Sequence, residues 1–191
     1  EEVTVTAQRR EQSLQDAAIS VQAFDQESLI QSGMESAQDL GAVSPALGIS
    51  AGGGPLTSFF VRGVGALTVN PLTDSAVAQN VDGIYLGRSS GAAGQALYDL
   101  ERVELLKGPQ GTLYGRNATG GVVNYIPNKP ILGENSGYLQ GEFGNLSKIG
   151  VQGAANFSLS DTTAIRISGN RLDRDGYSDD GSNDQGSFSL R

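Results

Sequence analysis

The chain has 191 residues, enough for one ordinary domain or for a small domain and part of another. It contains neither cysteine nor histidine, which excludes a disulfide framework, a Cys/His zinc site, a cysteine nucleophile and a His-based catalytic triad. The net charge of -8 argues against non-specific nucleic-acid binding, because phosphate contacts need clustered cations.

Glycine is the unusual component of the composition. The chain contains 27 glycines, roughly twice the ordinary share. They are spread among Val, Ile, Phe and Tyr, which favours tight turns and close backbone approach in a β-rich, loop-rich structure. Every apolar run is far shorter than the roughly 20 residues of a transmembrane helix.

The N-terminal residues predict short elements separated by polar segments. Residues 3–7 alternate β-forming side chains, and residues 8–12 read as a solvated linker. Residues 19–24 alternate apolar and polar side chains with a period of two, which predicts a strand. A helix is expected to start at Asp25, with acidic residues in its first turn, and to end at Gly33.

The next segments continue the mixture of helices and strands. We expect a second short helix at 36–40, then a strand, a glycine loop and another strand within 46–66. A long polar loop at 66–79 precedes a turn with apolar flanks at 81–85. Residues 99–106 are expected to lead from a short helical turn into a strand. Short strands and helices mixed in this way indicate a small α+β domain.

After Pro130 the pattern changes to long alternating strands. The clearest covers 149–159, with one apolar or small face and one polar face, and 165–170 repeats it after a tight turn at 160–163. A weaker strand precedes them at 138–143, and a fourth begins at 188. This length and alternation suit a tilted membrane β-strand, although a soluble antiparallel sheet alternates in the same way.

A lipid-facing barrel closes with at least eight strands, because every edge must be paired. Four strands therefore leave two readings open: either the sheet is soluble and packs on something, or the protein is longer than this chain. We favour the second.

Several chemical sites can be weighed from the residues alone. The glycine-rich stretch 115–122 lacks the Lys and Ser/Thr of a phosphate-binding loop. Glu101 and Glu104 flank Arg102, so structural ion pairing is expected rather than an acid pair, and no catalytic constellation is evident. Either a calcium site or a plain solvated loop would explain the cluster of acidic residues Asp173, Asp175, Asp179, Asp180 and Asp184.

One long motif is highly specific. Residues 103–124, VELLKGPQGTLYGRNATGGVVN, closely resemble the plug-domain signature of TonB-dependent outer-membrane receptors, and 60–65 and 81–85 resemble two further plug motifs in the same order. Lys107 stands where the family usually has Arg. The plug-motif residues carried over by this resemblance are Arg62, Gly63, Asp82, Gly83, Arg102, Glu104, Lys107, Gly108, Pro109, Gly115, Arg116, Asn117, Gly120 and Gly121.

The N-terminus resembles a TonB box, the segment through which such receptors bind the periplasmic domain of TonB. Its residues are Glu2, Val3, Thr4, Val5, Thr6 and Ala7. The resemblance implies that this segment is extended and unpaired and adds a strand to an exposed sheet edge of TonB. Val3, Val5 and Ala7 would then point to one side and Thr4 and Thr6 to the other.

The resemblance also implies the domain organisation and fold class. We expect a TonB box and linker at 1–12, an α+β plug domain at 13–132, and at 133–191 the first strands of an incomplete 22-stranded antiparallel transmembrane β-barrel. In that topology the 160–163 turn is periplasmic and the 173–185 loop extracellular. The protein would lie in the outer membrane of a Gram-negative bacterium, in contact with its lipid.

The implied function is TonB-dependent active transport of a small-molecule nutrient, with an iron–siderophore complex as the first expectation. Vitamin B12, an oligosaccharide or an aromatic compound are alternatives, as is a ligand-sensing receptor. No enzymatic activity, cofactor, resident metal or nucleic-acid partner is expected. The plug loops expected to face the cargo contain Gly53, Pro55, Leu56, Asn70 and Arg88.

Two structural roles are also expected of motif residues. Gly108-Pro109 and Gly120-Gly121 are expected to let the backbone turn sharply. Arg62, Arg102 and Arg116 are expected either to pair with carboxylates of the barrel wall or to brace the plug internally.

Overall fold

The structure is a computed structural model. It describes residues 4–7, 9–10, 12–34, 36–51, 57–67, 73–87, 97–176 and 185–191. The chain divides into two compact units, Glu1–Pro127 and Asn128–Arg191. None of the helices in these residues is long and apolar enough to cross a membrane.

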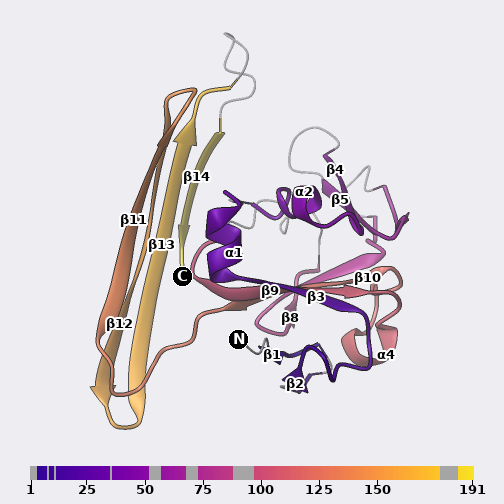
Figure 1. The fold of residues 1–191 in the computed structure, drawn as a ribbon, viewed down its shortest axis with the longest axis horizontal. Coiled ribbons are helices and arrows are strands. Elements are labelled where there is room, and N and C mark those ends of the chain that lie inside the picture. Colours follow the sequence, from indigo (N-terminus) through magenta and orange to yellow (C-terminus); the bar gives the residue numbers. More distant parts are fainter. Residues whose placement is uncertain are drawn as a thin grey trace. The chain divides into compact units, whose positions relative to one another are not determined.

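The first unit is built on a five-stranded mixed sheet (Figure 1). β10 pairs in parallel with β7, and the other pairs are antiparallel. This arrangement confirms the expected α+β class. In spatial order the strands are β3 (Val21–Asp25), β9 (Leu100–Lys107), β10 (Gly121–Pro127), β7 (Val77–Val81) and β8 (Ile84–Tyr85).

Smaller elements cover the two faces of this sheet. Figure 1 shows α1 and α2 on one side of it and β1 and β2 on the other. The helices are α1 (Gln26–Gln31), α2 (Leu40–Val43) and α4 (Gly111–Tyr114). The remaining strands are β1 (Thr4–Val5), β2 (Gln12–Ser13), β4 (Leu47–Ala51), β5 (Thr57–Val61) and β6 (Val64–Gly65).

Each face of the sheet has its own apolar core. On one face Phe59 and Tyr125, both fully buried, belong to a cluster that includes side chains of α1, α2 and β4. On the other face the N-terminal residues Val5 and Ala7 pack with Leu106 and residues around α4. The central strands are thus buried on both sides, which is why they do not read as simple alternating patterns.

The first helix forms as the sequence predicts. The carboxylate of Asp25 accepts a hydrogen bond from the backbone N–H of Ser28 over 2.8 Å and caps the helix, and Gly33 ends the turn with a φ of 63°. Hydrogen bonds from Ser28 lower the pKa of Asp25. The second helix is displaced from 36–40, because Asp39 accepts hydrogen bonds from Ser36 and the helix begins only at Leu40.

Two further expectations for this unit are wrong. The polar loop expected at 66–79 ends earlier, because β7 begins at Val77. The polar residues Gln79 and Asn80 suggested a loop, yet both are buried in this strand. The helical turn expected at the start of 99–106 is absent from those residues, which the structure describes: Asp99 has a φ of 49°, and the strand starts at the next residue.

The second unit is one antiparallel sheet in sequence order, β11–β12–β13–β14 (Figure 1). β12 and β13 are joined by a tight turn at Asp161 and Thr162, close to the predicted turn. All four predicted strands are confirmed: β11 (Ser136–Gly144), β12 (Lys148–Ser160), β13 (Thr163–Arg174) and β14 (Gln185–Leu190).

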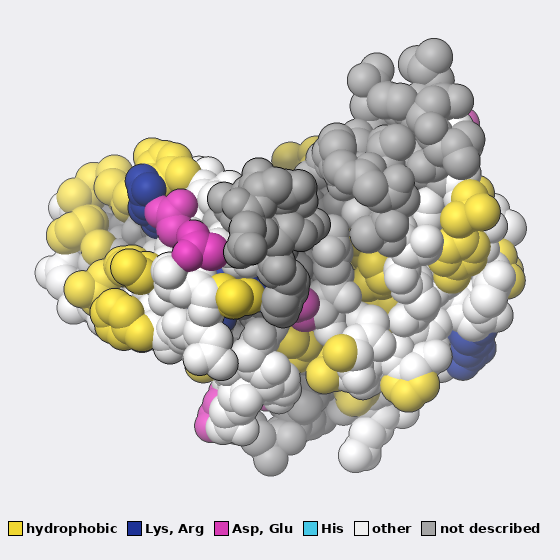
Figure 2. Space-filling model, turned by 90° about the horizontal axis from the view of Figure 1, so that it is seen from above, with side chains coloured by type: hydrophobic (Ala, Val, Ile, Leu, Met, Phe, Trp, Pro, Cys, Tyr) yellow, Lys and Arg dark blue, Asp and Glu magenta, His cyan; other side chains and the backbone are white. Residues whose placement is uncertain are grey.

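This sheet has one apolar face and one polar face. The pairing register places Leu139, Phe157 and Ile167 on the same side, with exposed fractions of 81%, 48% and 51%. Figure 2 shows hydrophobic side chains gathered over this unit, on the left of the view. The opposite side carries Gln140 and Gln152, which hydrogen-bond each other over 2.9 Å. An exposed apolar face of this size is what a lipid-facing sheet requires.

Candidate functional site

The described part of the predicted TonB box, residues 4–7, packs within the first unit. In β1, Thr4 lies opposite Ser13 and Val5 opposite Gln12. Val5 and Ala7 are fully buried, whereas Thr4 is exposed. The expected alternation of side chains is therefore present, but the expectation of an unpaired segment is wrong for its described part, because two apolar side chains find a core to pack in.

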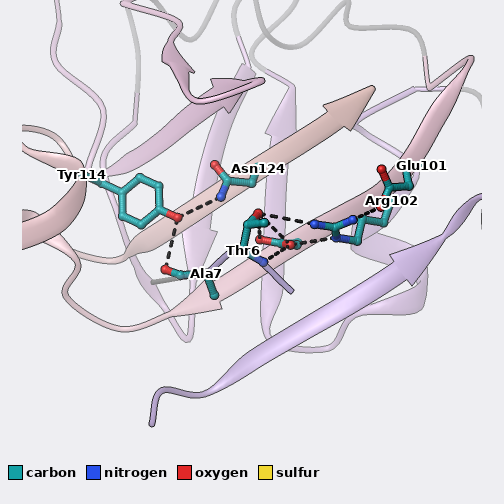
Figure 3. A network of polar contacts seen from close by, with 7 residues as sticks. Thr6, Ala7, Glu101, Arg102, Tyr114 and Asn124 are labelled. Carbon is teal, nitrogen blue, oxygen red and sulfur yellow. Dashed lines mark hydrogen bonds and ion pairs between the residues drawn. The ribbon is translucent and has the colours of Figure 1, made fainter. Parts of the chain in front are cut away.

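A buried carboxylate holds the middle of this segment (Figure 3). The backbone N–H of Thr6 donates to Oε1 of Glu104 over 2.7 Å, and the Thr6 hydroxyl lies 3.1 and 3.3 Å from the two carboxylate oxygens. Nε of Arg102 donates to the same Oε1 over 2.8 Å. Glu104 is fully buried. We call Thr6, Glu101, Arg102 and Glu104 the Glu104 clasp.

The charge of Glu104 in the Glu104 clasp is paired within β9. Arg102 pairs with Glu104 on one side and with the half-exposed Glu101 on the other. Its Nη2 also lies 3.5 Å from the Thr6 hydroxyl. The expectation of structural ion pairing among these three residues is confirmed. Because the guanidinium neutralises the carboxylate, Glu104 can be buried without an isolated charge.

A tyrosine holds the next residue of the segment. The hydroxyl of Tyr114 donates to the carbonyl oxygen of Ala7 over 3.1 Å and accepts from Nδ2 of Asn124 over 3.0 Å (Figure 3). Burial raises the pKa of Tyr114, so the phenol stays protonated and can donate. The guanidinium of Arg9 lies 5.3 Å from the centre of the Tyr114 ring, a cation–π contact.

The plug motif forms the surface that residues 4–7 contact. We call this the receiving surface; it consists of Arg102, Glu104, Tyr114 and Asn124. Glu104 and Asn124 face each other in the β9–β10 register, and Arg102 lies two residues away on the same face. Between these strands the chain reverses through Gly108, whose φ is 100°, and α4 places Tyr114 over the same face before Gly115 with a φ of 78°. Only glycine adopts such angles without strain.

The chain bends at Gly120 before β10, as predicted, and Gly120 and Gly121 also have a second role. A Cβ on Gly120 would lie 2.6 Å from the carbonyl oxygen of Val64, and one on Gly121 would lie 2.4 Å from that of Leu106. Neither has a positive φ. They are required because the neighbouring backbones approach closely, which a side chain would prevent.

The two upstream motifs form tight hairpins. Arg62-Gly63 joins β5 to β6 and Asp82-Gly83 joins β7 to β8, with φ between 48° and 80° at all four residues. Two consecutive positive φ values define the type I′ turn, whose twist suits antiparallel strands. The hairpin geometry therefore explains the residue pairs Arg62-Gly63 and Asp82-Gly83 in the two motifs.

The three predicted arginines make contacts inside the first unit. Nη2 of Arg62 donates to the hydroxyl of Ser20 over 2.9 Å, and Arg102 belongs to the Glu104 clasp. Arg116 lies 3.3 Å from Asp74 at the surface, where Asn117 also donates to Asp74 over 3.0 Å. These contacts favour internal bracing over the alternative of pairing with a barrel wall.

Some predicted residues lie outside the described part of the chain: Glu2, Val3, Gly53, Pro55, Leu56, Asn70 and Arg88. So do Asp179, Asp180 and Asp184 of the acidic loop, whereas Asp173 pairs with Arg171 over 2.6 Å. Among the described residues there is no group of three or more acidic side chains arranged to hold a metal. Lys107 and Pro109 lie in the plug motif, and the Lys107 N–H donates to the carbonyl oxygen of Ser20 over 2.9 Å.

Two residues of the receiving surface were missed by sequence reasoning, Tyr114 and Asn124. Asn124 interrupts an otherwise apolar run in β10, and a polar residue inside a buried strand was the available indication. Tyr114 lies within the recognised motif, but nothing local shows that its hydroxyl contacts residue 7.

Comparison with known proteins identifies the first unit. The family described as TonB-dependent Receptor Plug Domain matches residues 13–122. The pesticin receptor of Yersinia pestis is 38% identical over 114 residues, which cover 59% of this chain and 16% of that receptor. The vitamin B12 transporter BtuB of Vibrio vulnificus is 29% identical over 187 residues, which cover 92% of this chain and 28% of BtuB.

Solved structures show the same fold. The ferric yersiniabactin uptake receptor FyuA of Yersinia pestis superposes with a TM-score of 0.73 at 28% identity, over 90% of this chain and 27% of that receptor. The ferripyoverdine receptor of Pseudomonas aeruginosa gives a TM-score of 0.76 at 20% identity, over 91% and 23%. The chain thus spans less than a third of the length of these relatives. It belongs to the family of TonB-dependent receptors, whose plug domain it carries.

Proposed function

We propose that this chain forms the energy-coupling segment, the plug and the first barrel strands of a transporter that carries an iron–siderophore complex into the periplasm. Family membership places it in the outer membrane of a Gram-negative bacterium. The relatives are receptors and transporters, so we propose a role in transport rather than in catalysis. The exposed apolar face of the second unit supports contact with lipid.

The cargo is proposed from the relatives. FyuA is named as a receptor for ferric yersiniabactin, and this chain is 28% identical to it over most of its own length. Vitamin B12 is the second candidate, because the match to BtuB covers 92% of this chain. The residues expected to face the cargo, among them Asn70 and Arg88, are part of this proposal.

The observation that supports energy coupling is the position of residues 4–7 on the first unit. Among the described residues, β1 pairs with β2 through Thr4 and Val5. The sheet of the TonB periplasmic domain, if it added this segment as a strand, would replace that short pairing with a longer one. The energy-coupling segment is therefore accessible to TonB once its contacts with β2 and the plug are replaced by strand pairing with TonB.

The Glu104 clasp suits repeated release. When Thr6 leaves, Glu104 keeps its hydrogen bond from Arg102, so no buried charge is left alone. Withdrawal of Val5 and Ala7 also removes part of the core that covers Leu106. A pull on the segment therefore loosens one face of the plug sheet directly.

Deletion of residues 1–7 in the complete protein tests the proposal. Energised uptake of a radiolabelled ferric siderophore should be lost while binding at the cell surface stays intact. Val5→Pro should act like the deletion, because proline removes a backbone N–H needed for strand addition, and Val5→Ala is its matched control. Uptake that is unchanged by the deletion would refute the proposed coupling.

A further inference from the structure

The connector that precedes β11 is held against the polar face of β12 by Asn156. The side chain of Asn156 is almost completely buried, with 1% exposed. Its Oδ1 accepts from the backbone N–H of Ile131 over 2.9 Å. Its Nδ2 donates to the carbonyl oxygens of Ile131 over 2.9 Å and Glu134 over 2.7 Å.

The hydrogen bonds between the Asn156 side chain and the backbone of Ile131 resemble those between two paired strand residues. A carboxamide is the side-chain group that offers both a carbonyl acceptor and N–H donors, as a peptide group does. Here it binds the N–H and the C=O of the same residue, Ile131. A carboxylate would lose the two donated hydrogen bonds, and an aliphatic side chain of similar size would lose all three.

Ser158 extends the contact along the same strand. Its hydroxyl accepts from the N–H of Gly133 over 2.8 Å, and its backbone N–H donates to Oδ1 of Asn135 over 2.9 Å. Together with those of Asn156, five hydrogen bonds hold residues 131–135. All of them lie before Ser136, where the β11–β12 pairing begins opposite Asn156.

We infer that Asn156 and Ser158 form an anchor that stops a pull on the first unit from reaching the second. Tension that passes along the chain from Pro127 meets these five hydrogen bonds before it meets the first pair of β11. Without them it would load the β11–β12 ladder directly, at its first pair, Ser136 with Asn156. In the cell the pull would come from TonB, so the physiological meaning rests on the proposed function.

Force spectroscopy on the complete protein in a lipid bilayer tests this anchor without TonB. With the N-terminus attached to the probe, extension should stop after about 130 residues, roughly 430–470 Å at 3.3–3.6 Å per residue. In Asn156→Leu the stop should disappear, and extension should continue through β11 by roughly 50 Å more. Asn156→Asp should behave in the same way, since it lacks both donors.

Gln152→Leu is the matched control. Gln152 lies on the same face of β12 and hydrogen-bonds Gln140 of β11 over 2.9 Å, but it does not contact the connector. This variant should keep the stop at about 130 residues. A stop at the same extension in Asn156→Leu, or no stop in the unmodified protein, would overturn the inference.

Hydrogen exchange without load gives a second readout. The amide of Ile131 should exchange roughly tenfold faster in Asn156→Leu, because its part-buried hydrogen bond to Oδ1 of Asn156 is lost. Exchange in β12 and β13 should not change. Equal exchange at Ile131 in both proteins would also contradict the anchor. If uptake survives deletion of residues 1–7, the proposed coupling fails while these two measurements still decide on the anchor.

Discussion

Replacing Tyr114 by phenylalanine loosens the N-terminal segment without altering its sequence. The hydroxyl that is removed donates to the carbonyl oxygen of Ala7 over 3.1 Å in a buried place. Loss of such a hydrogen bond costs about 1–2 kcal/mol. Since 1.4 kcal/mol corresponds to a factor of ten, the population with residues 4–7 released should rise about 5- to 30-fold.

The assay is binding of the purified periplasmic domain of TonB to the complete protein in detergent. When the binding-competent state is a minor population, the apparent affinity rises in proportion to it, so Tyr114→Phe should bind TonB about 5- to 30-fold more tightly. The Thr6 amide, which is bonded to Glu104, should exchange its hydrogen faster by a similar factor.

Tyr125→Phe is the control for this experiment. Tyr125 is fully buried on the opposite face of the same sheet, where its hydroxyl lies 3.4 Å from Gln79. Its loss affects the stability of the plug but not the N-terminal segment. If Tyr114→Phe and the unmodified protein bound TonB equally and exchanged the Thr6 amide equally, the reasoning about this contact would be refuted.

Three more predictions concern stability. Asp25→Ala should destabilise the plug by about 1 kcal/mol in urea unfolding at neutral pH. Because the pKa of Asp25 is lowered in the folded state, the difference should begin to fall below the ordinary pKa of about 3.9 and disappear only below the lowered pKa; a difference that stays constant with pH would contradict it. Gly121→Ala should reduce the protease resistance of the plug, since its Cβ would lie 2.4 Å from a carbonyl oxygen of β9, whereas Gly111→Ala, with nothing within 4 Å, should not. Leu139→Lys should weaken folding into liposomes by up to about 2–4 kcal/mol, and Gln140→Lys on the polar face should have little effect; equal effects would refute the assignment of the faces.

The strands of the second unit could be predicted because a single repeating feature specifies them. Alternation with a period of two survives where one face meets polar groups and the other apolar surroundings, as in 149–159. β7 and β10 are buried on both faces, so their side chains do not alternate and the sequence gives no such indication. α4 is only one turn long, too short for a helical period.

The candidate site was predicted in part. The pairing of Arg102 with Glu104 follows from their spacing in a strand, which places both on one face. The contact of Glu104 with Thr6 joins residues that are 98 positions apart, and no local pattern encodes it. The expectation of an unpaired N-terminal segment was implied by the family resemblance, whereas the buried core below Val5 becomes visible only in the folded unit.

The glycines show the same limit. Gly63 and Gly83 are recognisable as turn residues because each follows a polar residue between apolar neighbours. Gly120 and Gly121 are also needed because the backbones of β6 and β9 approach them closely, and no local pattern indicates this second role. The local sequence thus predicts turn conformations, whereas a close approach between different segments is visible only in the structure.

A reversible lock on the N-terminal segment tests the central claim most directly. Thr4 and Ser13 lie opposite each other in the β1–β2 pair, and the chain has no natural cysteine, so Thr4→Cys with Ser13→Cys can tie the segment in place. Oxidised transporter should bind cargo but take up none, and reduction should restore uptake, while each single cysteine variant stays active. Equal uptake by the cross-linked and reduced forms would contradict the claim that residues 4–7 must leave the plug.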